Sequence, residues 1–315
     1  MKRLIIILVV LLLCFTACTN EYHPVIKTPA PTPEPTPEPY DPQKYTLGIY
    51  GAPNAAIHGF IEKCDELSYN YKVFDTDLTE ALSWARNAEC GLLIYGASEN
   101  DRALINETAA YGGAILTAFF ESEKKPLGAL RELSFATDTS AKICAGILAD
   151  KLDGSEGALL ICGTNNDTTD CEDIFRTEWE LLKSTHKLDS IELIGKEYCD
   201  NLKQVNNVLA RKQGIKAVYA ASAESAVLWA DAVKDLEEKP IIISDQVSVE
   251  YLEYVKSGII EAAYIYPDKE LGETAVIEMD AFLRGEQLTN QEIPSGTLAD
   301  SKSDINSLIE LLKDV

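Results

Sequence analysis

The residue types that most often carry catalysis are scarce in this chain or lack the spacing that the chemistry requires. Its 315 residues include three histidines, His23, His58 and His186. There is no Gly-x-Ser-x-Gly elbow for a serine nucleophile and no Gly-x-x-x-x-Gly-Lys loop for a nucleoside triphosphate. The first predicted strand runs into Gly-Ile-Tyr-Gly-Ala-Pro-Asn (48–54), which is not a dinucleotide fingerprint. We therefore expect no enzyme, no cofactor and no metal site.

The net charge limits the possible partners, and the length limits the number of domains. The chain has 28 Lys and Arg against 51 Asp and Glu, a formal net charge of −23. Such a field repels a phosphate backbone, so nucleic acid is not an expected partner. The length suggests about two domains of ~150 residues each.

The first residues are typical of an export signal. Lys2 and Arg3 precede an apolar run that is too short to span a membrane, followed by Phe15-Thr16-Ala17-Cys18. A cysteine after a small residue resembles the bacterial lipobox, although Phe15 replaces the usual leucine. The resemblance implies a signal peptide over 1–17 and a lipid on Cys18. The alternative is an ordinary signal peptide that leaves Cys18 unmodified.

A proline-rich tether is predicted after Cys18. In residues 28–42 nearly every second residue is proline, which favours extended polyproline II over a helix or a central strand. At ~3.1 Å per residue this stretch spans about 45 Å. Residues 18–44 are therefore expected to form a tether that holds a folded body away from a membrane.

The cysteines permit several interpretations. Beyond Cys14 and Cys18 the chain contains Cys64, Cys90, Cys144, Cys162, Cys171 and Cys199. An even number of cysteines outside the cell permits disulfides, but the spacing of the cysteines does not show which of them would pair. Cys144 and Cys162 lie within apolar stretches and are expected to be buried thiols.

Strand and helix patterns alternate from Tyr45 onward. Short apolar runs, typical of parallel strands covered on both faces, occur at about 46–50, 70–74, 91–95, 114–119, 131–136, 158–162, 190–194, 216–220, 240–244 and 261–265. Amphipathic helices are expected between them, at about 57–67, 77–88, 99–110, 139–152, 170–184, 201–213, 222–237, 247–256 and 269–284. This alternation predicts an α/β protein with parallel sheets.

The order of these elements resembles that of the type I periplasmic binding proteins, specifically the ribose/galactose-type solute-binding group that serves ABC importers. The resemblance covers about 45–315. It is carried by Thr137-Asp138, Gly146, Asp153-Gly154 and Gly163-Thr164, which occupy the places of the family's turns and of its Gly-containing helix.

The resemblance implies two Rossmann-like lobes joined by a three-crossing hinge. One lobe would comprise 45–137 plus 268–293, and the other 138–267 plus 294–315. A ligand would lie in the cleft at the carboxyl ends of the strands, and hinge closure would trap it.

The loops after the strands supply the expected ligand-binding residues. They are Asn54, Ser98, Phe119, Phe120, Glu121, Asn165, Cys171, Phe175, Ser222, Asp245 and Tyr266. The chain departs from the sugar-binding pattern, because Phe119-Phe120 replace the family's Asp-Arg. Cys171 and Ser222 stand in for an arginine and an asparagine, whereas Asp245 remains.

These replacements favour a flatter or more apolar ligand, such as a nucleobase, an aromatic compound or a modified sugar. The alternative is that the rings pack into the core. Cys171 and Cys199 would both lie on loops at the cleft of one lobe, where a disulfide between them is conceivable.

Three functions therefore stay open. The first is a monomeric, lipid-anchored, extracytoplasmic protein that delivers a small molecule to an ABC permease. The second is a receptor for a membrane sensor, or a degenerate cleft, on the same fold. The third is an extracellular enzyme, for which no nucleophile and base pair is identifiable.

Overall fold

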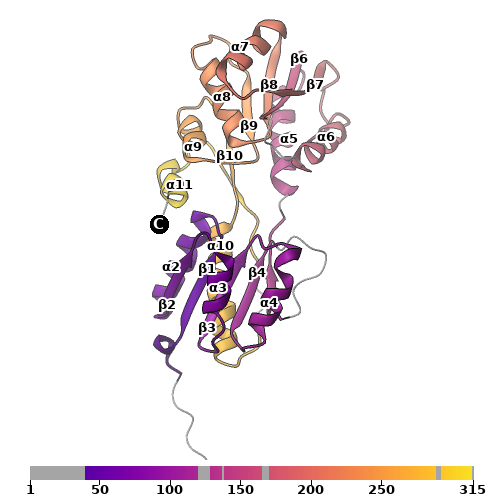
Figure 1. The fold of residues 1–315 in the computed structure, drawn as a ribbon. Helices are drawn as coiled ribbons and strands as arrows, with labels where there is room; N and C mark the ends of the chain where they lie inside the picture. Colours follow the sequence, from indigo (N-terminus) through magenta and orange to yellow (C-terminus); the bar gives the residue numbers. More distant parts are fainter. Residues whose placement is uncertain (1–39, 120–127, 137, 165–169, 289–291, 314–315) are drawn as a thin grey trace, which may run out of the picture. The chain divides into compact units, whose positions relative to one another are not determined.

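The computed structural model describes residues 40–119, 128–136, 138–164, 170–288 and 292–313. Residues from Asp41 onward form one compact unit. Its described strands form two sheets, in the orders β2-β1-β3-β4-β5 and β11-β10-β9-β8-β6-β7 (Figure 1). Every pairing among these strands is parallel except that of β10 with β11. The predicted α/β class with two lobes is confirmed.

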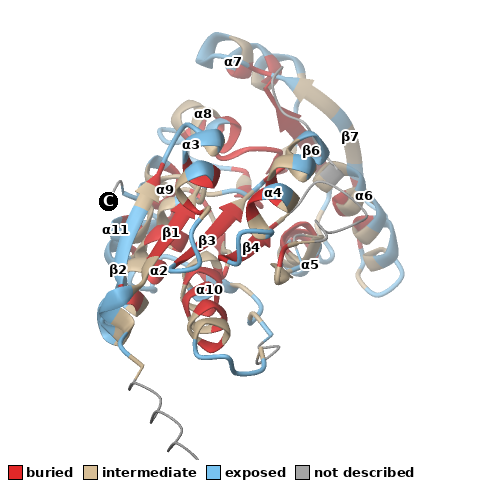
Figure 2. Ribbon diagram, turned by 60° about the horizontal axis from the view of Figure 1, so that its bottom comes forward, coloured by how far each residue is buried: buried red, intermediate tan, exposed pale blue. Residues whose placement is uncertain are grey.

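The first lobe is built on the five-stranded sheet. Its strands are β1 (Thr46–Tyr50), β2 (Asn70–Phe74), β3 (Cys90–Tyr95), β4 (Ala114–Ala118) and β5 (Arg131–Leu133). Its helices are α2 (Asn54–Leu67), α3 (Leu78–Trp84), α4 (Arg102–Ala109) and α10 (Asp268–Leu283), with short 3₁₀ turns η1 (Pro42–Lys44) and η2 (Glu99–Asp101). The central strands β1, β3 and β4 are buried along most of their length (Figure 2), as apolar runs covered on both faces must be.

Two glycines let α2 and α10 approach closely. A Cβ atom at Gly59 would lie 2.1 Å from the carbonyl oxygen of Lys269, and one at Gly272 would lie 2.0 Å from that of Ala56. Neither distance is possible for a real side chain. The contact therefore joins helices that are far apart in the sequence, and it requires glycine on both of them.

The second lobe is built on the six-stranded sheet. Its strands are β6 (Gly157–Gly163), β7 (Ile191–Tyr198), β8 (Ile215–Ala220), β9 (Ile241–Ser244), β10 (Ala263–Ile265) and β11 (Thr297–Ala299). Its helices are α5 (Asp138–Leu152), α6 (Asp170–Leu182), α7 (Leu202–Arg211), α8 (Ala223–Val233), α9 (Val249–Lys256) and α11 (Ile305–Leu312).

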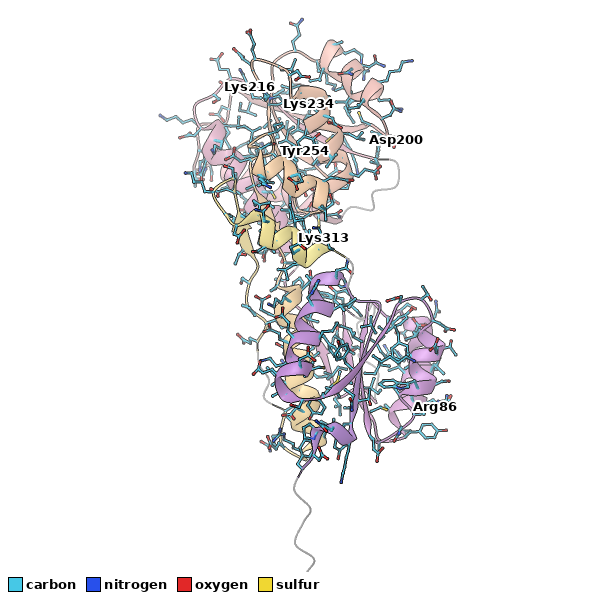
Figure 3. All side chains as sticks on the ribbon, turned by 90° about the vertical axis from the view of Figure 1, so that its left-hand side faces the viewer. Arg86, Asp200, Lys216, Lys234, Tyr254 and Lys313 are labelled. Atoms are coloured by element: carbon cyan, nitrogen blue, oxygen red, sulfur yellow. The ribbon has the colours of Figure 1, made fainter. Side chains whose placement is uncertain are left out.

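Large buried rings fill this second lobe on both faces of its sheet. Trp179 and Tyr219 lie in one core cluster, and Trp229 and Tyr251 lie in another. The packed helices also carry polar links, because the Tyr254 hydroxyl on α9 donates a hydrogen bond to Asp231 on α8. Lys234 binds the same carboxylate at 3.0 Å, and Figure 3 labels Tyr254 and Lys234 in this region.

The chain passes between the two sheets three times: after β5, after β10 and after α10. These passages are the first, second and third crossings. In the third, the backbone N–H of Gly296 donates a hydrogen bond to the Tyr264 hydroxyl on β10 at 3.1 Å. The three crossings agree with the predicted hinge topology.

Several predicted bounds are wrong. The strand expected over 131–136 ends at Leu133, because the pairing of β5 with β4 covers three residues. The helix expected over 77–88 ends at Trp84, and the Asn87 side chain then accepts a hydrogen bond from the N–H of Glu89 in a turn. The short strand β11 was not expected at all.

One turn forms inside the expected tether. Asp41 accepts a hydrogen bond from the N–H of Gln43 and precedes the 3₁₀ turn η1, which starts at Pro42. Proline suits the first position of a helical turn because its missing N–H would have no partner there. Residues 18–39 of the predicted tether, and the signal peptide, lie outside the described residues.

Candidate ligand-binding site

The second lobe gathers polar side chains at the carboxyl edge of its parallel strands. Asp245 directly follows β9, Tyr266 follows β10, and Cys171 lies in the first turn of α6, which comes after β6. Parallel strands β6, β8, β9 and β10 end at the same edge, which brings these three predicted residues together. In open α/β sheets this edge is where ligands bind.

Asp245 is buried and has no hydrogen-bond partner within the described ranges. Its exposed fraction is 1%, and neither carboxylate oxygen has a partner among the described residues. Burial raises the pKa of this carboxyl above its ordinary value, and the nearby Cys171 thiol, its own backbone and the Tyr219 hydroxyl oppose the shift without reversing it. A buried acid that is compensated only in part is costly for the fold and is typical of functional sites.

Two buried groups next to Asp245 were not predicted as site residues. Tyr219 lies inside β8, and its hydroxyl also has no hydrogen-bond partner among the described residues. Burial, followed by the charge of Asp245, raises the pKa of Tyr219. Cys144 on α5 is fully buried, as expected for this thiol, and burial followed by Asp245 raises its pKa as well.

Tyr266, which lies at the same edge of the sheet as Asp245, belongs to a series of aromatic rings. Its hydroxyl forms a 2.6 Å hydrogen bond with that of Ser140, the third residue of α5. Its ring stacks on Phe135 of the first crossing, with 5.5 Å between centroids and 25° between planes. It also meets Tyr264 edge-on at 5.1 Å. Burial raises the pKa of Tyr266, and the charge of Asp245 adds to that shift.

Phe119 extends the same aromatic series. Its ring lies 4.8 Å from that of Phe135 and 5.2 Å from that of Tyr95. Its backbone has a φ of +50°, a strained value for a bulky residue, directly after β4. Strained positions of this kind are often found at ligand contacts. The five rings Tyr95, Phe119, Phe135, Tyr266 and Tyr264 are called the aromatic series below.

Three other predicted polar residues bind partners within the protein. The Asn54 amide donates to the carbonyl oxygen of Leu312 at 3.0 Å. The Ser98 hydroxyl donates to Asp101 at 2.7 Å, which closes a turn. Ser222 caps α8 by accepting a hydrogen bond from the N–H of Ser225.

Phe175 is placed in the core. It is fully buried on α6 and stacks on Tyr219, with 3.9 Å between centroids and 11° between planes. It therefore packs against one face of the Tyr219 ring.

The disulfide considered between Cys171 and Cys199 is not formed, because both are free thiols. Cys162 is fully buried, as expected for this thiol.

The remaining predicted positions lie outside the described residues. They are Phe120, Glu121, Asn165 and the lipidation position Cys18.

The sequence carried weak signals for the side chains that were missed. Phe135 belongs to an expected strand, and Tyr219 lies in the interior of another. In such apolar strands the sequence does not show which side chains face a ligand. Tyr95 closes an apolar run, and its hydroxyl donates to Asp268 at 2.9 Å, a contact between distant segments. Ser140 carried no signal beyond its place in the first turn of a predicted helix.

Two cavities lie at the crossings. One, of about 330 Å³, is bounded by the first and third crossings and includes Phe135 and Tyr264. The other, of about 160 Å³, includes Tyr266, Asp268 and leucines of α11. Neither includes Asp245 in its lining.

The described part of the chain contains no group of three or more His, Cys, Asp or Glu that is placed to hold a metal ion. Within the described ranges, no helix is both long and apolar enough to span a bilayer.

Comparison with known proteins identifies the fold. No protein-family profile matches the sequence, and no curated protein matches it. Among solved structures, the periplasmic ribose ABC transporter protein of Conexibacter woesei is similar, with a TM-score of 0.66, 14% identity, and coverage of 86% of this chain and 98% of that one.

Two further structures give the same result. A sugar-binding protein of a sugar ABC transporter from Bacillus halodurans has a TM-score of 0.64 at 18% identity, over 84% of this chain and 99% of that one. GanP, a glucose-galactose binding protein from Geobacillus stearothermophilus, has a TM-score of 0.60 at 16% identity, over 82% and 98%. The chain therefore has the fold of the type I periplasmic binding proteins.

Proposed function

We propose that this chain is an extracytoplasmic solute-binding protein that captures a small molecule between its lobes and presents it to an ABC importer. The observation that carries the proposal is Asp245, a buried carboxylate without a partner among the described residues, at the edge of the sheet where such folds bind ligands. The similar structures include sugar-binding proteins of ABC transporters, which supports the same function. It is a binding function rather than an enzymatic one.

The lobe boundaries belong to this proposal. One lobe comprises 45–137 plus 268–293, and the other comprises 138–267 plus 294–315. The contact of α10 with α2 and the pairing of β11 with β10 support these bounds. Closure at the three crossings would trap the ligand, and the closed form would be what a permease recognises.

The ligand combines hydrogen-bonding groups with a flat or apolar body. Asp245, Cys171, Tyr219 and the Ser140–Tyr266 pair offer the polar contacts, and the aromatic series offers ring faces. A sugar-like molecule uses both kinds of contact, and so does a nucleoside-like or aromatic one. The predicted residues Phe120, Glu121 and Asn165 remain candidates for the same site.

A second function is favoured by the internal hydrogen bonds of the polar candidates. Asn54, Ser98 and Ser222 all bind partners within the protein, which leaves fewer side chains for hydroxyl groups. A chain of this kind would serve as the extracellular receptor of a membrane sensor, or as a domain with a degenerate cleft. A permease and an ATPase encoded beside this chain would favour transport, whereas a kinase would favour sensing.

The membrane attachment is a separate proposal. Signal cleavage before Cys18 and a lipid on its sulfur would anchor a monomer to the cell surface through the proline-rich tether. Labelled fatty acid should enter the expressed chain, and Cys18→Ala should abolish the label. Equal labelling of both chains would contradict the anchor.

Thermal unfolding of the full chain against a panel of sugars, nucleosides, amino acids and aromatic metabolites tests the solute-binding function. A ligand present at 100 times its Kd should stabilise the protein by about 2.7 kcal/mol. That corresponds to a Tm increase of a few degrees for lobes of this size. A cooperative transition that no compound shifts would favour the degenerate receptor instead.

A further inference from the structure

Asp245 stands out because no positive charge compensates it among the described residues. Both of its carboxylate oxygens are closed to solvent and unpartnered within those ranges, as is the neighbouring Tyr219 hydroxyl. Besides burial, the groups that shift its pKa are Cys171, its own backbone and Tyr219, and none of these is a cation. Burial therefore disfavours the charge of this acid, and the groups around it offset that cost only in part, without a positive charge.

The basic residues of the surrounding elements are already paired. Arg176 on α6 and Lys196 on β7 both bind Glu172, at 2.8 and 3.3 Å. On the other elements around the site the pairs are Lys142 with Asp138, Lys151 with Glu261, Lys216 with Glu238, and Lys256 with Glu253. No described cation on these elements is thus committed to Asp245, and a positive charge there has to come from elsewhere.

Aromatic faces lie beside the same carboxylate. Tyr219 on β8 pairs with Ile243 of β9, two residues before Asp245, and Tyr266 follows β10, which also pairs with β9. The charge of Asp245 contributes to the raised pKa of both tyrosines. Phe135 stacks on Tyr266, so the ring surface continues away from the acid. A cation near a carboxylate and over aromatic faces gains from the ion pair and from the ring quadrupoles together.

A second acidic group lies near the same rings. Asp268 accepts a hydrogen bond from Tyr95, a member of the aromatic series, at 2.9 Å. With Tyr266 it borders the cavity of about 160 Å³. Lys269 also borders that cavity, but its ammonium group binds Glu62 at 2.7 Å. Carboxylates and aromatic rings therefore lie on more than one side of Tyr266, while the adjacent Lys269 forms its ion pair with Glu62.

We propose that the ligand of this site carries a protonated amine, which pairs with the Asp245 carboxylate and faces the rings of Tyr219 and Tyr266. This inference rests on the proposed solute-binding function, since it names the chemical class of the ligand at that same site. Because the carboxylate is closed to solvent, the ligand reaches it when the side chains around it separate. An amine is the ligand group that supplies both the missing charge and hydrogen-bond donors to the unpartnered oxygens.

Matched pairs of compounds that differ in one amine test the proposal. Tyramine is compared with tyrosol, and D-glucosamine with D-glucose, by calorimetric titration of the full chain at pH 7. The amine of at least one pair should bind about tenfold or more tightly than its neutral partner, as expected for a charge-assisted contact. Asp245→Asn should reduce the affinity for that amine to the level of the neutral compound.

Two further variants separate the local contact from other effects. Asp235→Asn removes the same charge from an exposed position after α8, and it should leave the preference for the amine unchanged. Tyr266→Leu removes a ring and should weaken amine binding several-fold. A cooperative melt of each variant shows that it has folded.

The outcomes distinguish this inference from the function on which it rests. If a neutral compound binds as tightly as its amine, or if Asp245→Asn keeps the preference, the amine inference is wrong and solute binding stands. The amine inference is also wrong if neither pair binds but another panel compound without an amine does. If nothing in the panel or the pairs binds, both proposals are overturned.

Discussion

The hydroxyl of Tyr264 accepts a hydrogen bond from the backbone N–H of Gly296, and a side chain at position 296 would occupy the space of that hydroxyl. A Cβ atom there would lie 2.7 Å from the Tyr264 oxygen and 2.4 Å from the carbonyl oxygen of Ile265. The end of β10 and the third crossing therefore fit together because residue 296 has no side chain.

Gly296→Ala is accordingly expected to destabilise the protein by about 1–3 kcal/mol, the usual cost of overpacking. Urea unfolding of the two proteins measures this difference. The matched control is Gly146→Ala in α5, where an added Cβ meets nothing within 4 Å. There alanine should stabilise the helix by up to about 1 kcal/mol. Equal effects at the two positions would argue against the close contact at the crossing.

Gly272→Ala tests the contact between α2 and α10. The added Cβ would lie 2.0 Å from the carbonyl oxygen of Ala56 and 2.9 Å from the N atom of Phe60, so the helices must move apart. We expect a loss of about 2 kcal/mol or more in the free energy of unfolding. Hydrogen exchange should locate the loss in α2 and the strands beneath it. A loss spread equally over the second lobe would contradict this assignment.

Asp245→Asn should make the protein more stable at neutral pH. Burial raises the pKa of Asp245, so the folded state holds this proton more tightly than the unfolded state does. Wild-type stability therefore falls as pH rises from the unfolded pKa, about 3.9, to the raised folded pKa. The variant lacks that fall and should therefore be the more stable protein above it.

Thermal unfolding of both proteins between pH 4 and pH 8 measures this gain. The two curves should meet near pH 4 and separate as the pH rises. If the wild type is the more stable protein at pH 8, the carboxylate has a partner that the structure does not show.

His186 should also make the protein less stable as the pH rises, but the cause is the loss of an attractive contact rather than the burial of a charge. A hydrogen bond to Asp150, at 3.0 Å from the imidazole Nε2, raises the pKa of His186 and joins the turn after α6 to α5. The stabilisation is fully present below the unfolded pKa of about 6.5, and it is lost as pH rises through the higher folded pKa.

The difference in Tm between wild type and His186→Gln should therefore shrink as the pH rises from 6 through the folded pKa. Asp150→Asn removes the partner and should reproduce the same loss at pH 6. A difference that stays constant over the whole range would mean that the imidazole charge contributes nothing.

Local sequence was enough to place much of the fold. β1 and β2 match the predicted ranges 46–50 and 70–74, because each is an apolar or β-prone run bounded by turn residues. β11 escaped prediction since Thr-Leu-Ala is three residues long and two of them are exposed. It becomes a strand through its antiparallel pairing with β10, which local sequence does not encode.

The candidate site was less accessible to prediction. The position of Asp245 at the carboxyl end of β9 could be predicted, because the residue directly follows an apolar run. Tyr219 could not, because whether it supports the core or faces a ligand depends on side chains from α6 that pack against it. The sequence does not show that the Asn54 side chain is engaged within the protein, because its partner Leu312 lies 258 positions further along the chain. Ser222, by contrast, is a local helix cap that the sequence does signal.

The place of α10 has a consequence for the order in which the chain can fold. Ribosomes make proteins from the amino end, so every described strand of the first sheet is finished early, at Leu133. Met279, whose sulfur packs against Gly91 of β3, arrives after all of the second sheet except β11. Until then that face of the first sheet lacks α10, and the emerging chain presents the apolar surface that α10 covers. The lobe that is synthesised first is thus completed late.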